Sequence, residues 1–135
     1  MYFVDNQNHL DPSVNIALET YLLKEKNLDE PILLFYINEP SIIIGRNQNT
    51  IEEINQTYVE ENNIHIVRRM SGGGAVYHDL GNFSFCFITE DDGNSFRDFA
   101  KFTEPVIEFL HKAGVKDAAL KGRNDLTIGE QKFSG

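Results

Sequence analysis

The sequence predicts an α+β fold, in which helices flank a mixed, mostly antiparallel sheet. Short β-prone runs with turn signals between them recur along the chain, and segments of helical periodicity interrupt them. A hydrophobic fraction of 41% in 135 residues is enough for one packed core. No repeat, linker or low-complexity tract divides the sequence, so residues 1–135 are predicted to belong to one domain.

The first half of the chain begins with a helix and two β-prone runs. Asp11 is a predicted N-cap, and the proline after it suits the first helical position. Two apolar runs follow at residues 32–37 and 41–45, and the turn at 38–40 predicts that the second returns alongside the first. Because both runs are apolar throughout, we expect a sheet covered on both faces. Helical spacing predicts that the first helix buries Val14, Ala17, Leu18, Tyr21 and Leu22.

The middle of the chain alternates a helix with three strands. Thr50 and Glu53 have the spacing of a capping box, which predicts a helix over residues 51–61. Strands are predicted at residues 64–69, 75–79 and 83–89. In the third of these strands, Phe83, Phe85 and Phe87 are expected to share one face.

Helical periodicity returns from Ser95, through Phe96, to residue 113, where Gly114 suits the position after a helix. Its apolar face is expected to include Phe109. Pro105 predicts either a kink or two helices, the second capped by Thr103. Short strands are expected near residues 118–120, 126–128 and 132–134. The chain stops within the last of these, so we expect it to be a fragment of a longer protein.

The most informative segment is VRRMSGGGAVYHD, residues 67–79. Glycine lets a ligand approach the backbone, and successive N–H groups of a glycine run can converge on an anion. Arg68 and Arg69 add positive charge and forked donors, so the segment predicts a phosphate or carboxylate site. A plain hairpin is the alternative, although it would need neither the arginines nor Ser71. The segment matches neither a Walker loop nor a dinucleotide-binding fingerprint.

Composition excludes several classes of function. A net charge of -9 argues against a nucleic-acid partner held by phosphate contacts. No apolar run approaches the about 20 residues of a membrane span, and no secretory leader is visible, so we expect a cytoplasmic protein with no membrane partner. The single cysteine, Cys86, excludes an internal disulfide and is expected to be a small buried residue. The histidines lack ligand spacing, so no protein-bound zinc is expected.

Three further sets of residues are candidates for chemistry. A hairpin through residues 129–130 would place Asp125 and Lys132 on neighbouring strands, although a turn aspartate and a surface lysine would give the same pattern. The segment IGRNQN, residues 44–49, offers polar contacts at a strand end or is simply a helix-entry loop. His78 is a candidate acid or base, or a structural partner of Asp79.

These motifs together resemble those of the lipoate–protein ligases. The resemblance rests on RRMSGGGAVYHDLGN at residues 68–82, IGRNQN at 44–49, GRNDL at 122–126 and KFSG at 132–135. It implies a fold shared with biotin protein ligases and class II aminoacyl-tRNA synthetases. It also implies that residues 1–135 are the N-terminal part of the catalytic domain. The rest of that domain and a small C-terminal domain would then lie beyond residue 135.

The resemblance implies a reaction in two steps. The carboxylate of lipoate attacks the α-phosphate of ATP, with Mg²⁺, to give lipoyl-AMP and pyrophosphate. A lysine amine of an acceptor domain then attacks the lipoyl carbonyl and releases AMP. The implied acceptors are the acyltransferase subunits of 2-oxo-acid dehydrogenase complexes and the glycine-cleavage H protein.

Residue roles follow from the same resemblance. Lys132 is the implied catalytic residue, in contact with both the lipoyl carbonyl and the α-phosphate, and Asp125 would orient it or help to hold Mg²⁺. No metal is expected to be held by the protein alone. Arg69 would bind ATP phosphates. The residues implied along the adenylate are Gly74, Ala75, Val76 and Tyr77, and those implied for lipoate are Gly72, Gly73 and His78, together with Lys132.

Two other functions stay open at this point. The same superfamily includes octanoyl- and lipoyl-transferases that need no ATP and use a cysteine nucleophile, for which Cys86 is the candidate here. A truncated, non-catalytic module that binds lipoate or a nucleotide is the third possibility.

Overall fold

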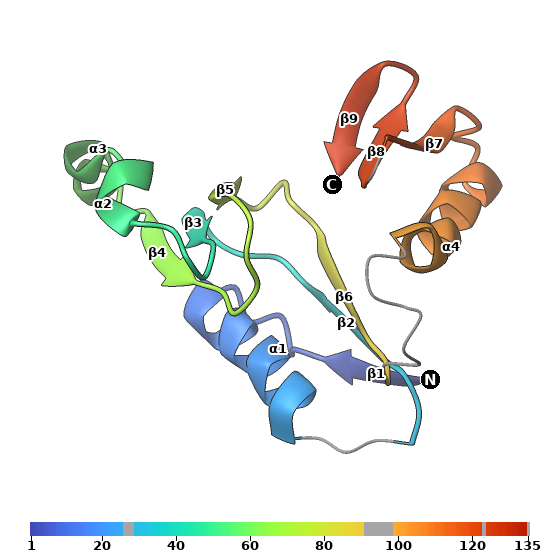
Figure 1. Cartoon of the computed structure of the whole chain (residues 1–135), viewed down its shortest axis with the longest axis horizontal. Helices are drawn as coiled ribbons and strands as arrows, with labels where there is room; N and C mark the ends of the chain where they lie inside the picture. Colours follow the sequence, from blue (N-terminus) through green and yellow to red (C-terminus); the bar gives the residue numbers. More distant parts are fainter. Residues whose placement is uncertain (26–28, 91–98, 123, 135) are drawn as a thin grey trace. The chain divides into compact units, whose positions relative to one another are not determined.

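The computed structural model describes residues 1–25, 29–90, 99–122 and 124–134 (Figure 1). The chain forms two compact units, Met1–Thr89 and Glu90–Gly135. Among the described strands, two pairings are parallel and four are antiparallel. This mixed, mostly antiparallel α+β architecture confirms the predicted fold class.

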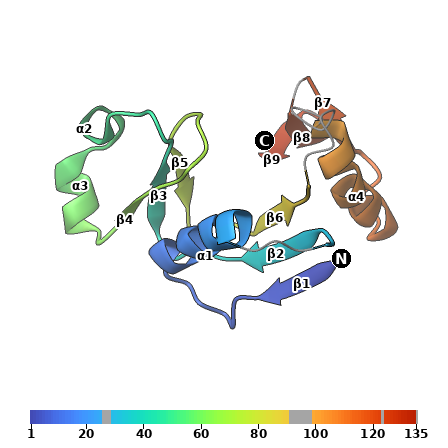
Figure 2. The same ribbon diagram turned by 60° about the horizontal axis from the view of Figure 1, so that its bottom comes forward.

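The first sheet of the first unit has the order β1-β2-β6. The central strand β2 (Ile32–Tyr36) runs parallel to β1 (Tyr2–Asp5) and antiparallel to β6 (Ser84–Ile88). Helix α1 (Pro12–Glu25) lies against this part of the unit (Figure 2). The core between them is a cluster of buried side chains, namely Leu22, Ile32, Leu34 and Tyr36.

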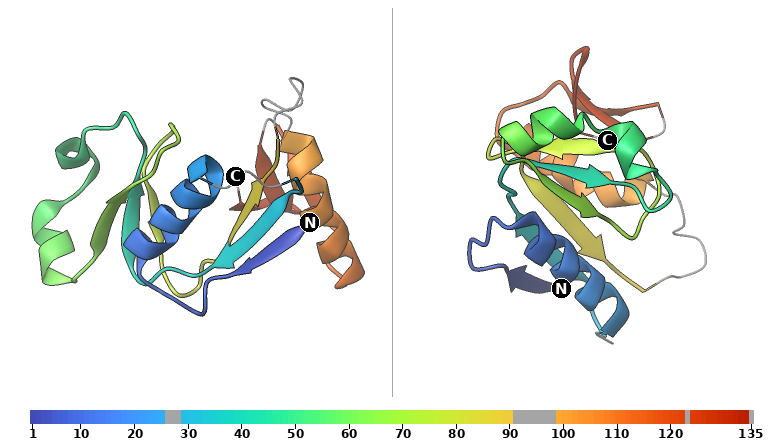
Figure 3. Two further views of the ribbon diagram at one scale, coloured as in Figure 1. Left: turned by 90° about the horizontal axis from the view of Figure 1, so that it is seen from below. Right: turned by 90° about the vertical axis from the view of Figure 1, so that its left-hand side faces the viewer.

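The second sheet has the order β4-β3-β5. Strand β3 (Ser41–Ile44) lies between β4 (His65–Arg68), to which it is parallel, and β5 (Val76–His78), to which it is antiparallel. Two short helices, α2 (Thr50–Glu53) and α3 (Gln56–Glu61), connect β3 to β4 (Figure 3). This arrangement places the ends of β3, β4 and β5 around the glycine-rich segment.

The predicted pairing of residues 32–37 with 41–45 is wrong, because β2 and β3 belong to different sheets. The intervening turn is bound to other segments of the chain. The N–H of Glu39 donates to the carbonyl oxygen of Leu10, and that of His65 donates to Pro40. These contacts carry the chain from one sheet to the other instead of reversing it.

The prediction of a sheet covered on both faces holds for β3, where the adjacent residues 43 and 44 are both buried, but only in part for β2. In β2 the residues on one face are buried, whereas Leu33 and Phe35 on the other are half-buried. The ring of Phe35 lies 5.8 Å from that of Phe3 and 4.9 Å from that of Phe83, between centroids. Phe85 and Phe87 continue this face, with centroids 6.0 Å apart, as the alternation predicted.

Helix capping was predicted correctly in one place and wrongly in another. The N–H of Ser13 donates to Asp11 Oδ1 at 2.8 Å, which confirms the cap of α1. Thr50 does not form a capping box, because its hydroxyl accepts a hydrogen bond from Arg68 instead. The predicted helix is therefore divided into α2 and α3, and Asn55 caps the second through the N–H of Tyr58.

The predicted apolar face of α1 is wrong in part. Leu22 is buried as expected, but Val14 and Tyr21 are 43% and 48% exposed. Asn15 and Ile16 are buried in their place. The helix is rotated because the Asn15 amide finds hydrogen-bond partners inside the unit, which removes the cost of burying it.

Over residues 99–122 and 124–134, the second unit forms a three-stranded antiparallel sheet and one helix. Its strands are β7 (Ala118–Lys121), β8 (Asp125–Ile128) and β9 (Gln131–Ser134), in the order β7-β8-β9. Helix α4 (Phe99–Lys112) contacts β7. Ser95, Phe96, Arg123 and Gly135 lie outside the described residues.

Helix α4 runs through Pro105 without a break, so the two-helix alternative is wrong. The Thr103 hydroxyl donates to the carbonyl oxygen of Phe99 at 2.6 Å, within the helix and not at a new cap. The predicted stop at Gly114 is confirmed by its φ of 98° and by two hydrogen bonds that close a Schellman motif. Phe109 is 67% exposed, outside the face that was predicted for it. No described helix has the length and apolarity that crossing a membrane requires.

Candidate functional site

The glycine-rich loop, residues 69–75, crosses the end of strand β3. Strands β4 and β5 precede and follow this loop, and they lie on opposite sides of β3. The backbone N–H of Arg46, just after β3, donates to the carbonyl oxygen of Ser71 at 2.9 Å. The plain hairpin alternative is therefore wrong, because a hairpin would pair β4 directly with β5.

Two glycines allow this crossing. A Cβ atom built on Gly45 would overlap the carbonyl oxygen of Gly73, and Gly73 itself has a φ of 93°, which side chains other than glycine rarely adopt. Gly72 and Gly74 are different, since a Cβ atom on either would meet nothing within 4 Å. The packing of the loop therefore requires glycine at 45 and 73, whereas open space surrounds 72 and 74.

Arg68 holds the segment that follows β3. Its guanidinium group donates to the carbonyl oxygens of Gly45 and Gln48 at 2.7 and 2.8 Å, and to Thr50 Oγ1 at 2.7 Å. The Gln48 side chain in turn accepts from the N–H of Gly45 at 2.8 Å. Residues 44–49 thus form an ordered helix-entry loop, as one of the two interpretations expected, and Arg68 is occupied in it.

Arg69 holds the glycine-rich loop through hydrogen bonds, as Arg68 holds the segment after β3. Its Nη2 atom donates to the carbonyl oxygens of Gly72 and Gly74 at 2.7 and 2.8 Å. Its Nη1 and Nε atoms donate to the carbonyl of Ile43 and the hydroxyl of Ser71. A guanidinium group has five N–H donors, so these contacts use four of them.

The carbonyl groups of Ser71, Gly72 and Gly74 are therefore engaged, while the N–H groups of the three loop glycines are not. Within the described part of the chain, the N–H groups of Gly72, Gly73 and Gly74 have no hydrogen-bond acceptor. Unused N–H groups beside a fixed cation are the components of an anion-binding loop. The loop can thus accept a phosphate or carboxylate without changing its internal contacts.

A cavity of about 330 Å³ opens beside the start of this loop. Its wall comes from helix α1, strand β6 and residues Arg69, Met70 and Ser71. Most of the wall is apolar, with contributions from Ile16, Leu23, Phe87 and Ile88. The cavity combines an apolar interior with polar donors from the loop.

Glu19 is the acidic residue of this cavity, and it was not predicted from the sequence. Tyr36 donates its hydroxyl hydrogen to Glu19 Oε1 at 2.8 Å. Burial raises the pKa of Glu19, and hydrogen bonds from Tyr36 and Cys86 offset part of that rise. Burial also raises the pKa of Tyr36, and the Glu19 charge and hydrogen bond add to the effect.

Cys86 lines the same cavity and is half-buried, which is more open than expected. Burial raises the pKa of Cys86 to about 12, and the neighbouring Glu19 charge adds to the rise. A thiol becomes a nucleophile only as the thiolate, so this surrounding makes Cys86 unreactive near neutral pH.

His78 lies on β5, and its side-chain partner is Asn38 and not Asp79. The Asn38 amide nitrogen lies 3.0 Å from His78 Nδ1. Asp79 Oδ1 instead accepts from the N–H of Gly81 at 2.8 Å. Burial and then the positive charge of Arg69 lower the pKa of His78, while Asp79 opposes them. The structural pair expected between residues 78 and 79 is therefore wrong.

The second unit brings Asp125 and Lys132 together as the spacing predicted. The Lys132 ammonium lies 2.8 Å from Asp125 Oδ1, and both side chains are about half exposed, at 54% and 47%. Gly129, with a φ of 58°, forms the turn of the hairpin between β8 and β9. An orienting contact for Lys132 is thus present within this unit. Lys132 belongs to the second unit and the glycine-rich loop to the first.

The remaining predicted residues are on or before strand β5. Ala75 is half-buried, and Val76 and Tyr77 are 44% and 51% exposed. No group of three or more potential metal ligands occurs among the described His, Cys, Asp and Glu residues. A carboxylate such as Asp125 suits Mg²⁺ only in company with other oxygen ligands, such as the phosphates of a nucleotide.

Sequence reasoning did not identify three polar residues of this region, because none belongs to a recognisable motif: Glu19, Asn15 and Asn38. The available signal was that Asn15 and Glu19 directly follow the apolar residues Val14 and Leu18 of a helix, and that Asn38 follows a buried strand. A polar residue that is buried at such a position must find a hydrogen-bond partner, so it is a candidate for a positioning role.

Comparison with known proteins matches this chain to one family. Residues 11–135 match the family model of the lipoyl protein ligase A/B catalytic domain. The chain is 62% identical to lipoate-protein ligase LplJ of Bacillus subtilis and 58% identical to lipoate–protein ligase 1 of Staphylococcus aureus. Each match covers the whole of this chain, which spans only 40% and 41% of the length of these two relatives.

Solved structures give the same result. A crystal structure of Plasmodium falciparum LipL1 in complex with lipoate has a TM-score of 0.78 and 34% identity, over 93% of this chain and 40% of that one. A lipoate-protein ligase A bound with ATP has a TM-score of 0.75 and 32% identity, over 87% of this chain and 52% of that one. The chain therefore belongs to the lipoyl protein ligase A/B catalytic-domain family.

Proposed function

We propose that the protein containing this chain is a cytoplasmic lipoate–protein ligase. It activates lipoate with ATP to form lipoyl-AMP and pyrophosphate. It then transfers the lipoyl group to a lysine amine of an acceptor protein, with release of AMP. The acceptors proposed are the lipoyl domains of 2-oxo-acid dehydrogenase complexes and the glycine-cleavage H protein.

The observation that carries this proposal is that some backbone groups of the glycine-rich loop are hydrogen-bonded within the protein and others are not. Arg69 engages the carbonyls of Gly72 and Gly74, while the N–H groups of residues 72–74 have no acceptor among the described residues. Adenylate formation brings a carboxylate and a triphosphate together, so it requires donors fixed in advance. The charge and remaining N–H of Arg69, with the N–H groups of the loop, fit this requirement.

The cavity beside the loop supports lipoate as the acid. Its apolar wall suits a short hydrocarbon chain with a disulfide ring, and its polar edge at Arg69 and Ser71 suits the carboxylate end. Among the similar structures, one contains lipoate and another ATP. Gly72, Gly73 and His78 remain the residues proposed for the lipoyl group, and residues 74–77 those for the adenylate.

Lys132 is proposed as the catalytic residue. Its ammonium group would stabilise charge on the α-phosphate during adenylation and on the lipoyl carbonyl during transfer. Asp125, paired with it at 2.8 Å, would orient it. Mg²⁺ would arrive with ATP, held mainly by phosphate oxygens, because the described residues contain no cluster of metal ligands.

An acceptor domain is supported by a third similar structure. This structure concerns a bipartite lipoate protein ligase and its E2 lipoyl domain from Thermoplasma acidophilum, with 33% identity and a TM-score of 0.76. The match covers 89% of this chain and 48% of the Thermoplasma chain.

The experiment uses the purified full-length protein, with separate readouts of pyrophosphate release and of the mass of an apo lipoyl domain. We expect both to require lipoate and ATP together, and lipoyl-AMP to accumulate when the acceptor is left out. Modification of the acceptor by lipoate without ATP, or by an acyl donor protein alone, would contradict the proposal.

A transferase that works through Cys86 is the second candidate, because this thiol lines the cavity. Its raised pKa of about 12 argues against a nucleophilic role. Replacement of Cys86 by serine should leave ligase activity within about twofold, since serine is similar in size. Loss of acyl transfer in a folded Cys86→Ser protein would favour the transferase.

A non-catalytic binding module is the third candidate. Calorimetry of the same full-length protein with a non-hydrolysable lipoyl-AMP analogue separates it from an enzyme. Binding of the analogue without any pyrophosphate release from ATP and lipoate would favour the module, whereas binding together with turnover supports the ligase.

A further inference from the structure

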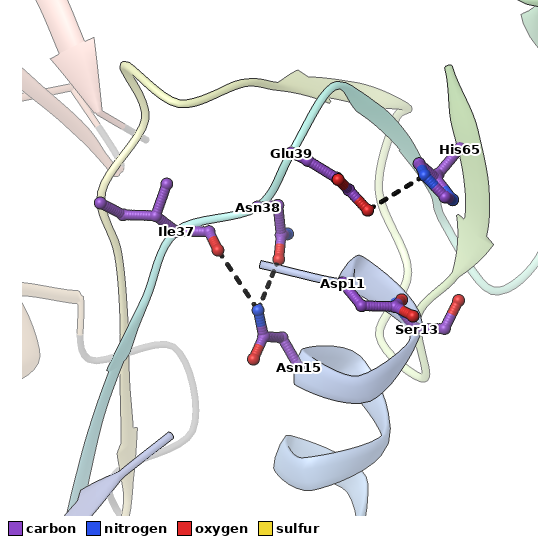
Figure 4. Close-up of polar contacts among 7 residues, drawn as sticks. All are labelled: Asp11, Ser13, Asn15, Ile37, Asn38, Glu39 and His65. Atoms are coloured by element: carbon purple, nitrogen blue, oxygen red, sulfur yellow. Dashed lines mark hydrogen bonds and ion pairs between the residues drawn. The ribbon is translucent and has the colours of Figure 1, made fainter. Parts of the chain in front are cut away.

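Two buried asparagines connect helix α1 to His78. Asn15 is 0% exposed and Asn38 is 1% exposed, and their side chains meet between α1 and the end of β2 (Figure 4). Asn15 Nδ2 lies 2.9 Å from Asn38 Oδ1, and Asn38 Nδ2 lies 3.0 Å from His78 Nδ1. We call these three side chains the asparagine–histidine relay.

Backbone carbonyls fix the orientation of the first amide. Asn15 Nδ2 lies 2.9 Å from the carbonyl oxygen of His9 and 3.3 Å from that of Ile37. Carbonyl oxygens only accept hydrogen bonds, so the amide nitrogen and not the oxygen must face them. Asn15 Oδ1 in turn accepts from Asn6 Nδ2 at 3.0 Å. The amide of Asn15 therefore cannot be reversed without losing these contacts.

The second amide and the imidazole follow from the first. Because Asn15 presents N–H groups to Asn38, the atom of Asn38 that faces it must be the oxygen. The Asn38 nitrogen then faces His78 Nδ1 and can only donate. Nδ1 must present a lone pair to accept this bond, so the single proton of a neutral His78 resides on Nε2.

We propose that Asn15 and Asn38 are positioning residues that hold His78 as the neutral Nε2–H tautomer, so that it donates a hydrogen bond to an oxygen of the activated acyl group and does not act as a base. This inference rests on the proposed function for the identity of the acceptor oxygen. The tautomer itself rests only on the contacts of the relay.

The charged groups around His78 agree with a neutral ring. Burial and Arg69 lower its pKa and Asp79 raises it. Glu39, next to Asn38 in sequence, is directed to His65, whose Nε2 lies 3.1 Å from Glu39 Oε1 (Figure 4). Protonation of Nδ1 would set an N–H against the N–H groups of Asn38, which adds a further cost to the charged form.

The relay also leaves Nε2 available. Among the described residues, the Nε2 atom of His78 has no hydrogen-bond partner, although the ring is half-buried on β5. A protonated Nε2 cannot accept a proton from an attacking amine, but it can donate to a carbonyl or phosphate oxygen. The same ring would be a suitable base only in the opposite tautomer.

The tautomer is measured directly by NMR of the full-length protein labelled with ¹⁵N in its histidines. His111 is an internal reference, since its Nε2 lies 2.8 Å from the carbonyl oxygen of Ala118 and must therefore carry a proton. We expect His78 to show a protonated Nε2, as His111 does, together with a bare Nδ1. A proton on Nδ1, or an equal mixture of tautomers, in the parent protein would overturn the proposal.

Asn38→Asp tests the relay. The carboxylate still accepts from Asn15 but presents an acceptor to Nδ1, so the proton of His78 should move to Nδ1. Adenylate formation should then fall about tenfold, the equivalent of one lost hydrogen bond. Asn8→Asp makes the same change of charge at an exposed position and should change neither tautomer nor rate. An unchanged His78 tautomer in folded Asn38→Asp protein would also overturn the proposal.

Two replacements of His78 provide a test that does not depend on Asn38. The amide nitrogen of glutamine can occupy the place of Nε2, whereas that of asparagine corresponds to Nδ1. A donor role predicts that His78→Gln retains at least tenfold more adenylation activity than His78→Asn. Equal, complete loss in both folded variants would indicate a base. If the full-length protein had no ligase activity, the proposed function would be wrong, but the NMR measurement of the His78 tautomer would still be valid. The proposed function and the proposed tautomer are therefore tested separately.

Discussion

Gly45 and Gly73 touch backbone to backbone where the glycine-rich loop crosses the end of β3. Besides the carbonyl oxygen of Gly73, a Cβ atom on Gly45 would meet its carbonyl carbon at 3.0 Å and the Gln48 side chain at 3.2 Å. This contact fixes the height of the loop above the strand. The shape of the proposed anion site therefore depends on a residue that lies outside the glycine run itself.

Replacement of Gly45 by alanine should consequently destabilise the protein. Backbone atoms of Gly73 cannot yield as a flexible side chain would, so we expect a loss of about 2 kcal/mol in the free energy of unfolding. Denaturant unfolding of the two proteins measures the difference. Gly74→Ala is a suitable control for the loss of a glycine, since open space surrounds Gly74. Gly114→Ser is not suitable, because the φ of Gly114 is positive. Equal stability of Gly45→Ala and the parent would contradict the described packing.

The pair Gly72 and Gly73 separates stability from ligand binding. Gly73→Ala should lose about 1–2 kcal/mol, because its φ is 93° and its Cβ atom would lie 3.0 Å from Arg69 Nη2. Gly72→Ala should leave stability within about 0.5 kcal/mol, since nothing lies within 4 Å.

The same Gly72→Ala protein should bind a lipoyl-AMP analogue about tenfold more weakly in calorimetry, because the methyl group occupies the proposed ligand space. Unchanged affinity would show that the ligand does not approach the backbone at this residue.

Lys132 is expected to be essential for chemistry and dispensable for folding. Its side chain is 54% exposed and paired only at the surface, so Lys132→Ala should have nearly the parental melting temperature. Lipoyl-AMP formation should fall by at least about 10²-fold, as for loss of a donor that stabilises a transition state.

Lys121→Ala is the matched control for Lys132→Ala. Lys121 lies in the same sheet and donates to Gly129 and Glu130 at 2.8 and 2.9 Å. This variant should retain adenylation activity. Comparable activity losses in the two variants would indicate damage to the sheet instead of a catalytic role.

Glu19 should make stability depend on pH. Its folded-state pKa is raised above 4.5 mainly by burial, so the folded protein favours the neutral carboxyl group. The contribution of neutral Glu19 to the free energy of unfolding is fully present below pH 4.5. It is lost as the pH rises through the raised pKa of Glu19 in the folded protein. Glu19→Gln preserves an oxygen for the Tyr36 hydroxyl without this charge. Melting temperatures of Glu19→Gln relative to the parent should thus increase from pH 4.5 into the neutral range, and a constant difference would refute the burial effect.

Features determined by neighbouring residues were predictable from the sequence. The cap at Asp11, the stop at Gly114 and the pairing of Asp125 with Lys132 each depend on fewer than about ten consecutive residues. A short turn fixes the register of the hairpin between β8 and β9, and this register brings Asp125 and Lys132 together.

Features that depend on distant contacts were not predictable. Thr50 was expected to cap a helix, but its hydroxyl is used by Arg68, 18 residues further along the chain. Arg68 and Arg69 were expected to offer their donors to a ligand, yet carbonyl and hydroxyl oxygens of the protein occupy most of these donors. Neither choice could be read from a local pattern, because each depends on how β3, β4 and β5 come together.

The rotation of α1 has the same origin. Asn15 is polar, so the apolar spacing of the helix did not include it among the buried residues. Its burial is explained only by acceptors at His9, Ile37 and Asn38, which belong to other parts of the unit. The candidate site was therefore predictable in its motif residues but not in the buried polar groups that hold them.

The state of Cys86 has a redox consequence for the proposed substrate. Lipoate carries a strained cyclic disulfide, which a nearby thiolate would open by exchange. With a pKa of about 12, only about one Cys86 side chain in 10⁵ is ionised at neutral pH. Since this is the only cysteine of the chain, its 135 residues can hold an oxidised dithiolane without becoming covalently trapped by it. Cys86 should then cause no difference between lipoate binding with and without a reducing agent.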